Sequence, residues 1–265
     1  MATPRSEDSD RAPAGVVRVR APNPSALTLD GTNTYVAAGW VVDPGPALDE
    51  HLAAVERAAG ERGVEGIVLT HGHVDHDEGA PALAERAGGV PVVRPSDGEH
   101  VGPFRAIATP GHSDDHVCLL WGRICFTGDT VLGAGSVFVG SNGGSMAAYL
   151  DSLRRLRELD LEAICPGHGP FVWDPHARID HYLAHRLERE RLILEAIGAG
   201  ARTRDEVVER AWSDTDLDAH ELLRLAAGLT LDAHLVKLRD EGRLPAGAPQ
   251  PAPPPPGFGR TSNSS

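Results

Sequence analysis

Metal-binding residue types crowd one short segment, directly after the apolar run at residues 66–69. Within six positions stand three histidines and an aspartate: His71, His73, Asp75 and His76. Neutral imidazole and carboxylate are the ligands that Zn²⁺ prefers in catalytic sites. Residues two apart on an extended chain point to the same side, so His71 and His73 can bind one metal ion together. Asp75 and His76 follow where the chain must turn, and they can reach a second ion.

Three further ligand candidates come later in the chain, each in a turn rich in glycine or proline. His112 ends the sequence Thr-Pro-Gly-His, Asp129 follows an apolar run at 123–126, and His168 follows another short apolar run. The chain has 13 histidines, so a histidine-rich surface loop is the alternative explanation. Ligands at the C-terminal ends of several strands would instead meet at one sheet edge, which favours a binuclear metal site.

Longer motifs around these residues narrow the interpretation. They read LTLDGTNTY, TPGHSDDH, TGDTVLG and PGHGP, at residues 27–35, 109–116, 127–133 and 166–170. Over roughly residues 16–244 the chain resembles the metallo-β-lactamase superfamily. It is most similar to the branch of β-lactamase-like endoribonucleases that carry a winged-helix-like tail. The metal motif is specific for the superfamily, whereas GTNTY and PGHSDDH indicate the branch.

The resemblance implies a fold and a ligand set. The fold would be a four-layer αββα sandwich of the α/β class, with the site at one edge of its two sheets. A small helical, winged-helix-like domain would follow. The first of two Zn²⁺ ions would be held by His71, His73 and His112, the second by Asp75, His76 and His168, and Asp129 would bridge them.

Ligand types separate this chain from two near relatives. The commonest zinc β-lactamases place a cysteine where this chain has Asp129, which speaks against that subclass. The diiron flavoproteins of the superfamily place a glutamate where this chain has His73, so zinc is favoured over a redox iron centre. The glycine-rich stretch 140–145 is a departure, because the branch usually carries acidic and aromatic residues there.

The ligand set predicts hydrolysis. Two Zn²⁺ ions about 3.5–4 Å apart can bind a bridging water and lower its pKa, and the resulting hydroxide is the nucleophile. Asp75 would orient this hydroxide. Metal-bound imidazoles need hydrogen-bonding partners, and Asp43 is a candidate, although an ordinary turn carboxylate explains it equally well. Asp114 and His116 are weaker candidates for the same role.

The chain divides into four predicted parts. Residues 1–14 would be disordered, 15–179 would form the catalytic domain, 180–244 the winged-helix-like domain, and 245–265 a disordered proline-rich tail. Thr203 and Glu206 predict a capping box at the start of a helix in the third part. No signal peptide or membrane span is expected, and three cysteines give no disulfide framework, so a cytoplasmic location is predicted.

Three functions from different classes fit these observations. The first is a binuclear zinc hydrolase of a small or carrier-bound ester, with a thioester favoured. The second is a metal-dependent ribonuclease, the activity that the branch resemblance implies. The third is a non-catalytic binding protein with a structural metal, which would need only one closed ligand set. The net charge is -13 and only 5% of residues are aromatic, which disfavours an RNA groove and favours an acyl substrate.

Overall fold

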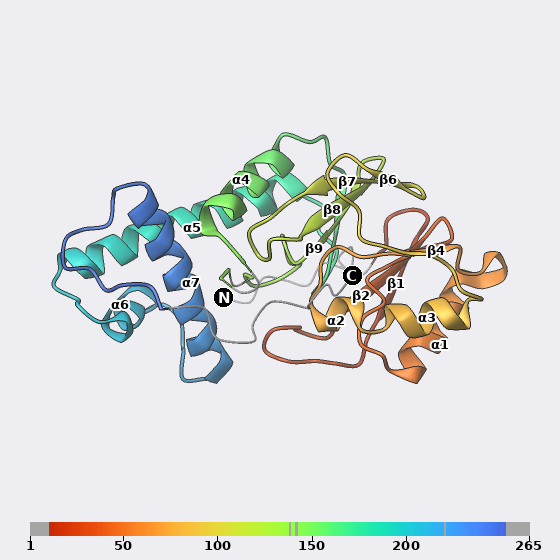
Figure 1. Cartoon of the computed structure of the whole chain (residues 1–265), viewed down its shortest axis with the longest axis horizontal. Coiled ribbons are helices and arrows are strands. Elements are labelled where there is room, and N and C mark those ends of the chain that lie inside the picture. The colour runs from red at the N-terminus through yellow and green to blue at the C-terminus, as the bar shows by residue number, and fades with distance from the viewer. Residues whose placement is uncertain (1–10, 138, 141–142, 220, 253–265) are drawn as a thin grey trace, which may run out of the picture. The chain divides into compact units, whose positions relative to one another are not determined.

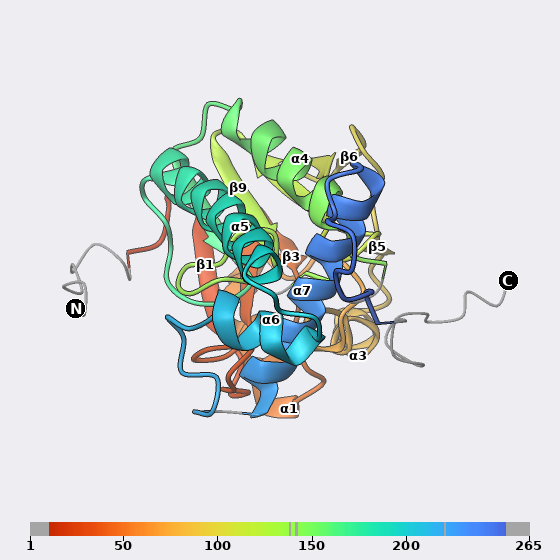
Figure 2. The same cartoon turned by 90° about the vertical axis from the view of Figure 1, so that its left-hand side faces the viewer.

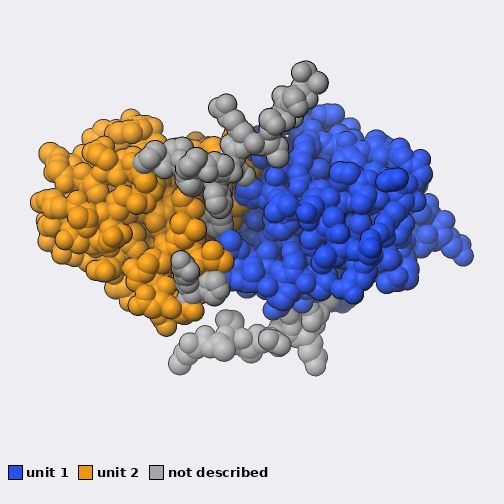
Figure 3. Space-filling view, turned by 60° about the horizontal axis from the view of Figure 1, so that its bottom comes forward, with its two compact units in different colours: residues 1–108, 115–136, 158–178 blue, residues 109–114, 137–157, 179–265 orange. Residues whose placement is uncertain are grey.

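The computed structural model describes residues 11–137, 139–140, 143–219 and 221–252. Much of the two terminal segments predicted to be disordered therefore lies outside the described residues, at 1–10 and 253–265. The chain divides into two compact units, coloured separately in Figure 3. Unit 1 contains residues 1–108, 115–136 and 158–178, and unit 2 contains residues 109–114, 137–157 and 179–265.

The first β-sheet of unit 1 is mixed and has the order β1-β2-β3-β4-β5. Strands β1 to β3 pair antiparallel, whereas β3 to β5 pair parallel. Parallel neighbours need crossover connections, and the segments that carry helices supply them after β3 and after β4. The strands are β1 (Val16–Arg20), β2 (Asn33–Ala37), β3 (Trp40–Val42), β4 (Gly66–Val68) and β5 (Val92–Val93).

The second sheet of unit 1 has the order β10-β9-β8-β7-β6. Its strands pair antiparallel except for the parallel pair β9 and β10. The C-terminal ends of β9 and β10 therefore lie at the same edge of this sheet, and the chain leaves both towards a predicted ligand. The strands are β6 (His100–Val101), β7 (Phe104–Ala108), β8 (Val117–Trp121), β9 (Ile124–Gly128) and β10 (Ala163–Pro166).

An apolar core joins the two sheets face to face. The ring of Tyr35 meets that of Phe126 edge-on at 5.3 Å between centroids, and Phe126 meets Phe104 in the same way at 5.4 Å. The Tyr35 hydroxyl also donates a hydrogen bond of 2.8 Å to the carbonyl of Pro166. This buried bond ties the first sheet to the end of β10, directly before the turn that carries His168.

Helices cover the outer face of the first sheet (Figure 1). Leu52 of α1 (Asp49–Ala59) and Leu83 of α3 (Ala80–Arg86) are buried against Val41 and Ile67. Two short helical segments, η2 (Gly60–Arg62) and α2 (Val74–Asp77), lie between these elements in the sequence. Two mixed β-sheets flanked by helices are the predicted αββα architecture, so the expected fold class is confirmed.

Unit 2 is built from helices. Its last three helices share a core that includes Ile193, Val207 and Leu231, all fully buried, and Figure 2 shows α6 lying beside α5 and α7. The predicted capping box is confirmed, since the Thr203 hydroxyl accepts from the Glu206 backbone N–H and the Glu206 carboxylate accepts from the Thr203 N–H. The helices are α4 (Met146–Arg157), α5 (Pro175–Gly198), α6 (Arg204–Ala211) and α7 (Glu221–Asp240).

The end of the described chain stays packed on unit 2. Ala248 is buried in its core, and the backbone N–H of Ala252 donates to the carboxylate of Asp232 at 3.0 Å. Among the described residues after 178 no strand is assigned, so a winged-helix-like identity for this part stays a prediction. None of the helices in the described ranges is long and apolar enough to cross a membrane. All three cysteines are buried and free of disulfides.

An ion-pair cluster around the buried Glu190 of α5 gives a first testable expectation. Glu190 accepts hydrogen bonds of 2.7 Å from both Lys237 and Arg243. Hydrogen bonding from His234, Lys237 and Arg243 lowers the pKa of Glu190 to about 2, against the opposing effect of burial. Because this folded-state pKa lies below the ordinary 4.5, the stability that the carboxylate contributes is present above about pH 4.5 and is lost as the pH falls towards 2.

The variant Glu190→Gln should therefore lower the free energy of unfolding near pH 7 by about 2 kcal/mol. The loss stays modest because Lys237 and Arg243 both retain Glu241 as a second partner. Denaturant unfolding between pH 7 and pH 2 measures it. The difference between wild type and variant should shrink as the pH falls, and a constant difference over this range would contradict the assignment.

Candidate metal centre

The histidine-rich segment begins directly where β4 ends. The Nε2 atom of His71 lies 3.0 Å from the Nδ1 atom of His73, so the two rings face a common point as the alternation of an extended chain requires. His73 then occupies the N-cap position of the one-turn helix α2, which carries Asp75 and His76. The turn predicted after His73 is this short helix. His71 and His76 are buried, whereas Asp75 is about a quarter exposed, with a side-chain exposure of 26%.

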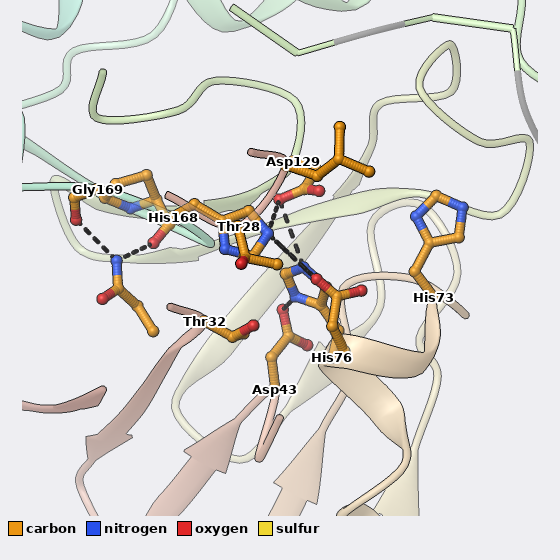
Figure 4. A network of polar contacts seen from close by, with 12 residues as sticks. Thr28, Thr32, Asp43, His73, His76, Asp129, His168 and Gly169 are labelled. Atoms are coloured by element: carbon orange, nitrogen blue, oxygen red, sulfur yellow. Dashed lines mark hydrogen bonds and ion pairs between the residues drawn. The ribbon is translucent and has the colours of Figure 1, made fainter. Parts of the chain in front are cut away.

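Four donor groups of unit 1 converge on a second point (Figure 4). His168 follows β10 and Asp129 follows β9, and both turn towards His76. The Nε2 atoms of His76 and His168 are 3.3 Å apart. The Asp129 Oδ1 atom lies 3.4 Å from each of them. The Asp75 Oδ2 atom lies 3.3 Å from His168 Nε2 and 3.6 Å from His76 Nε2.

These spacings fit a bound metal ion. An ion held at 2.0–2.1 Å by tetrahedral nitrogen and oxygen ligands spaces those ligand atoms by roughly 3.3–3.4 Å. The five distances given above range from 3.3 to 3.6 Å. The donor set, two imidazoles and two carboxylates, is also one that a divalent metal prefers. The four groups therefore fit a divalent cation of zinc-like size.

A second donor group in the same unit shares one member with the first. Ligand atoms of His71, His73 and Asp129 all lie within 4.8 Å of one another. Asp129 thus faces both the pair His71 and His73 and the pair His76 and His168. A carboxylate with two oxygens, placed between two sets of imidazoles, can serve two ions at once.

The electrostatics of the metal-free site follow from this crowding. Burial opposes the charge of Asp129, but the imidazoles of His168 and His76 outweigh it and hold the pKa of this carboxyl well below its usual range. Burial likewise disfavours the charge of His168, yet Asp129 and Asp75 raise its pKa to about 9. The pKa of His76 is raised well above its usual value for the same reason, by Asp75 and Asp129 acting against burial. In the metal-free protein, His76 and His168 therefore hold protons on the nitrogen atoms that a cation would contact.

Metal uptake at pH 7.5 should release about two protons per chain, because His76 and His168 must become neutral before they bind a metal. Calorimetric titration with zinc, repeated in buffers of different ionisation enthalpy, counts these protons. Apparent affinity should fall as the pH is lowered, since protons then compete more strongly for the same nitrogen atoms. Proton release close to zero at pH 7.5 would show that these histidines are already neutral and would contradict this account.

One buried carboxylate fixes the orientation of two histidines. Asp43 accepts from the backbone N–H of Thr70 at 2.8 Å and from the Thr70 hydroxyl at 2.6 Å, and its Oδ2 lies 3.0 Å from Nδ1 of His76. Since the Thr70 hydroxyl proton points to Asp43, the hydroxyl oxygen must accept from Nδ1 of His71, 2.9 Å away. With a metal ion bound, both imidazoles would thus carry their proton on Nδ1 and present the Nε2 lone pair to the metal side.

These hydrogen bonds favour a role for Asp43 in supporting the candidate ligands over a role as a metal ligand itself. Although Asp43 lies close to His71 and His76, its two oxygens already serve Thr70 and His76. The residue has a φ of 48°, a left-handed conformation that aspartate tolerates better than most residues. Thr70, which the sequence reasoning did not single out, completes the arrangement. Its only signal is its position between a strand end and His71.

The turn that carries His168 is held from the first sheet. The Asn33 side-chain amide donates to the carbonyls of Pro166 at 3.0 Å and Gly169 at 2.8 Å. The Nδ1 atom of His168 lies 3.4 Å from the carbonyl oxygen of Gly31. The GTNTY motif, which indicates the branch, therefore has a structural role, because its residues hold the backbone on both sides of the candidate ligand His168.

The structure places the remaining predicted residues as follows. His116 is buried, accepts a hydrogen bond of 3.1 Å from the backbone N–H of Asp129 through Nε2, and stacks on His71 at 4.8 Å. Asp114 is exposed and lies against Gly143. His112 is buried in the 109–114 segment, which belongs to unit 2. Its part in the first ligand set stays a prediction from the sequence.

Comparison with known proteins places this geometry in a family. The family model for the metallo-beta-lactamase superfamily matches residues 27–107 and 96–168. The chain belongs to the metallo-β-lactamase superfamily. It is 30% identical over 278 residues to the beta-lactamase-like protein 2 homolog of Drosophila melanogaster, covering 88% of this chain and 91% of the relative. The resemblance inferred from the sequence motifs is thereby confirmed, and the chain is a metal-binding hydrolase of this superfamily.

Two further proteins are similar to the chain over most of its length. The chain is 32% identical over 240 residues to the atrochrysone carboxyl ACP thioesterase of Aspergillus fumigatus, covering 77% of this chain and 75% of that protein. A crystal structure of a metallo-beta-lactamase family protein from Thermus thermophilus matches with a TM-score of 0.65 at 25% identity. It covers 86% of this chain and 94% of that chain. This chain thus shares the architecture of the Thermus thermophilus protein over most of the length of both.

Proposed function

We propose that this protein is a binuclear zinc hydrolase that cleaves a thioester attached to an acyl carrier. Asp75, His76 and His168 would hold one zinc ion, and His71, His73 and His112 would hold the other. Asp129 would bridge the two ions. The observation that carries this proposal is the set of spacings of 3.3–3.6 Å among the donor atoms of Asp75, His76, Asp129 and His168.

Zinc is proposed from the chemistry of the donors. The set is nitrogen-rich and contains no thiolate among its members, which suits Zn²⁺. When bound, a pair of zinc ions acidifies water and polarises an acyl carbonyl, which is the chemistry that hydrolysis needs. Asp43, through its hydrogen bonds to Thr70 and His76, would keep the imidazole ligands oriented for that chemistry.

Asp75 is the group proposed to handle the proton. It is the most exposed of the four converging donors, at 26% for the side chain, so it can meet both substrate and water. Hydrolysis forms a C–O bond from water to the acyl carbon and breaks the C–S bond. The proton taken from water passes through the Asp75 carboxylate to the departing sulfur. The products are a carboxylic acid and a thiol, so atoms and charge balance without any further reactant.

A carrier-bound acyl substrate is supported from two directions. A relative covering three quarters of this chain is named an acyl-carrier thioesterase. The net charge of -13 and the aromatic content of 5% are unfavourable for an RNA groove, which needs convergent cations and stacking rings. A ribonuclease remains the competing activity, since it would use the same ligands on a phosphodiester.

The test combines metal counting with a substrate panel. Purified protein is analysed for zinc, iron and manganese, and is then offered an acyl-carrier thioester, a small thioester, single-stranded RNA and a chromogenic β-lactam. The His168→Ala variant removes one ligand, and His100→Ala serves as the matched control because His100 is exposed. About two zinc ions per chain with thioester cleavage lost only in His168→Ala would support the proposal.

Two outcomes would count against it. If RNA were cleaved in a His168-dependent way while the thioesters stayed intact, the substrate would be RNA. The proposed metal centre would then stand, and the thioester proposal would fall. Protein that binds no metal even after zinc is supplied would overturn the hydrolytic mechanism altogether.

A further inference from the structure

The turn that carries His112 packs against helix α4 within unit 2. Gly111 has a φ of 140°, and a Cβ atom placed on it would lie 2.3 Å from the Cα atom of Tyr149. No side chain fits there, so backbone packs directly on backbone. Three residues further along α4, the buried hydroxyl of Ser152 donates a hydrogen bond of 2.8 Å to the carbonyl of Pro110.

Gly144 and Ser145, at the end of the glycine-rich stretch, also contact this turn. The backbone N–H of Ser145 donates to the carbonyl of Gly111 at 2.9 Å. A Cβ atom on Gly144 would lie 2.8 Å from the carbonyl oxygens of both Gly111 and His112. The carbonyl of Ser145 then accepts from the N–H of Tyr149 at 2.8 Å, at the start of α4. We call Gly144, Ser145, Tyr149 and Ser152 together the cradle.

The contacts of the cradle converge on the backbone around one side chain. They fix the carbonyls of Pro110 and Gly111 by hydrogen bonds and approach the carbonyl of His112 closely. With the backbone on the N-terminal side of His112 held in this way, the direction of its Cα–Cβ bond is held too. A metal ligand must stay within roughly 0.5 Å of its productive position, so such restraint is what a ligand-bearing turn needs.

We propose that the cradle is a positioning device for the His112 imidazole, with Gly144 and Ser152 as its positioning residues. The inference rests on the proposed function, which assigns His112 to one of the two zinc ions. It gives Gly144, near the end of the glycine-rich stretch, a role, since a side chain at this position would push the turn that carries His112 away. Neither Gly144 nor Ser152 would touch substrate or metal.

Zinc titration of the full-length Gly144→Ala variant tests the cradle. We expect one of the two binding steps to weaken about 10- to 100-fold while the other is unchanged. Gly198→Ala is the matched control, because a Cβ on Gly198 would meet nothing within 4 Å. Ser152→Ala removes only a hydrogen bond and adds no bulk, so it guards against misfolding, and it should weaken the same step about 2- to 10-fold.

The decisive comparison uses the His112→Ala background. There, adding Gly144→Ala should change neither binding step any further, because the side chain that the cradle positions is gone. Equal weakening of both steps by Gly144→Ala, or a further loss in the His112→Ala background, would overturn the inference. So would a normal titration of both Gly144→Ala and Ser152→Ala when His112→Ala alone weakens one step. Intact zinc binding by His112→Ala would overturn the proposed ligand set, and the inference with it.

Discussion

Replacing Asp75 by alanine should lower kcat towards the hydrolysed substrate by about 10³-fold or more. We propose two tasks for this carboxylate that alanine cannot perform, since it lies 3.6 Å from His76 and 3.3 Å from His168 as a candidate ligand and is exposed enough to pass a proton. Neighbouring groups favour its charged form, because the imidazoles of His76 and His168 outweigh burial and lower the pKa of Asp75. Steady-state kinetics at several pH values, with zinc content measured on the same samples, would record the effect.

A neighbour on the same helix provides the control for Asp75. Asp77 pairs with Arg94, so Asp77→Ala alters α2 without removing a donor from the converging set. We expect this variant to retain kcat within a few-fold. Activity of Asp75→Ala within tenfold of wild type, with its zinc retained, would remove Asp75 from the proposed proton transfer.

The second large effect is expected at Asp43. The variant Asp43→Ala leaves the Thr70 N–H, the Thr70 hydroxyl and His76 Nδ1 without their buried acceptor, which should lower the free energy of unfolding by about 3 kcal/mol or more. Because the same carboxylate fixes the imidazoles of His71 and His76, both zinc-binding steps should weaken about 10- to 100-fold. Denaturant unfolding of metal-free protein and zinc titration measure the two effects separately.

A graded pair of variants separates support of the ligands from general stability. Asp43→Asn tolerates the left-handed backbone at this position and keeps one acceptor oxygen, so its effects should be smaller than those of alanine. Asp30→Ala, at a carboxylate with 79% side-chain exposure, should change neither property. If Asp43→Ala destabilised the fold but left both zinc affinities intact, the residue would be structural and would have no influence on the ligands.

Local patterns made part of this structure predictable. The predicted pairing of His71 and His73 is observed, since the backbone at His73 is extended and the ring nitrogens of the two residues lie 3.0 Å apart. The Thr203 capping box was equally readable, since both partners lie within one helical turn. In each case the interacting groups are only a few residues apart, so no knowledge of tertiary pairing was needed.

Long-range pairing explains what the sequence could not show. Asp43 follows β3 and Thr70 follows β4, and these strands lie side by side in parallel, which brings two strand ends 27 residues apart together. Without knowledge of that pairing, Asp43 is as readily explained as a turn carboxylate as a supporting residue, and the only signal at Thr70 is its position before His71. The contact of Gly111 with Tyr149 is hidden for the same reason, because nothing local to either residue announces it.

The donors that converge near His76 come from both β-sheets of unit 1. Asp75 and His76 follow β4 of the first sheet, whereas Asp129 and His168 follow β9 and β10 of the second. A cation held by all four would act as a reversible cross-link between the sheets, with its binding energy added to the apolar core that joins them. Separation of the two sheets and release of the ion would then occur together. The proposed catalytic centre would therefore also stabilise the fold.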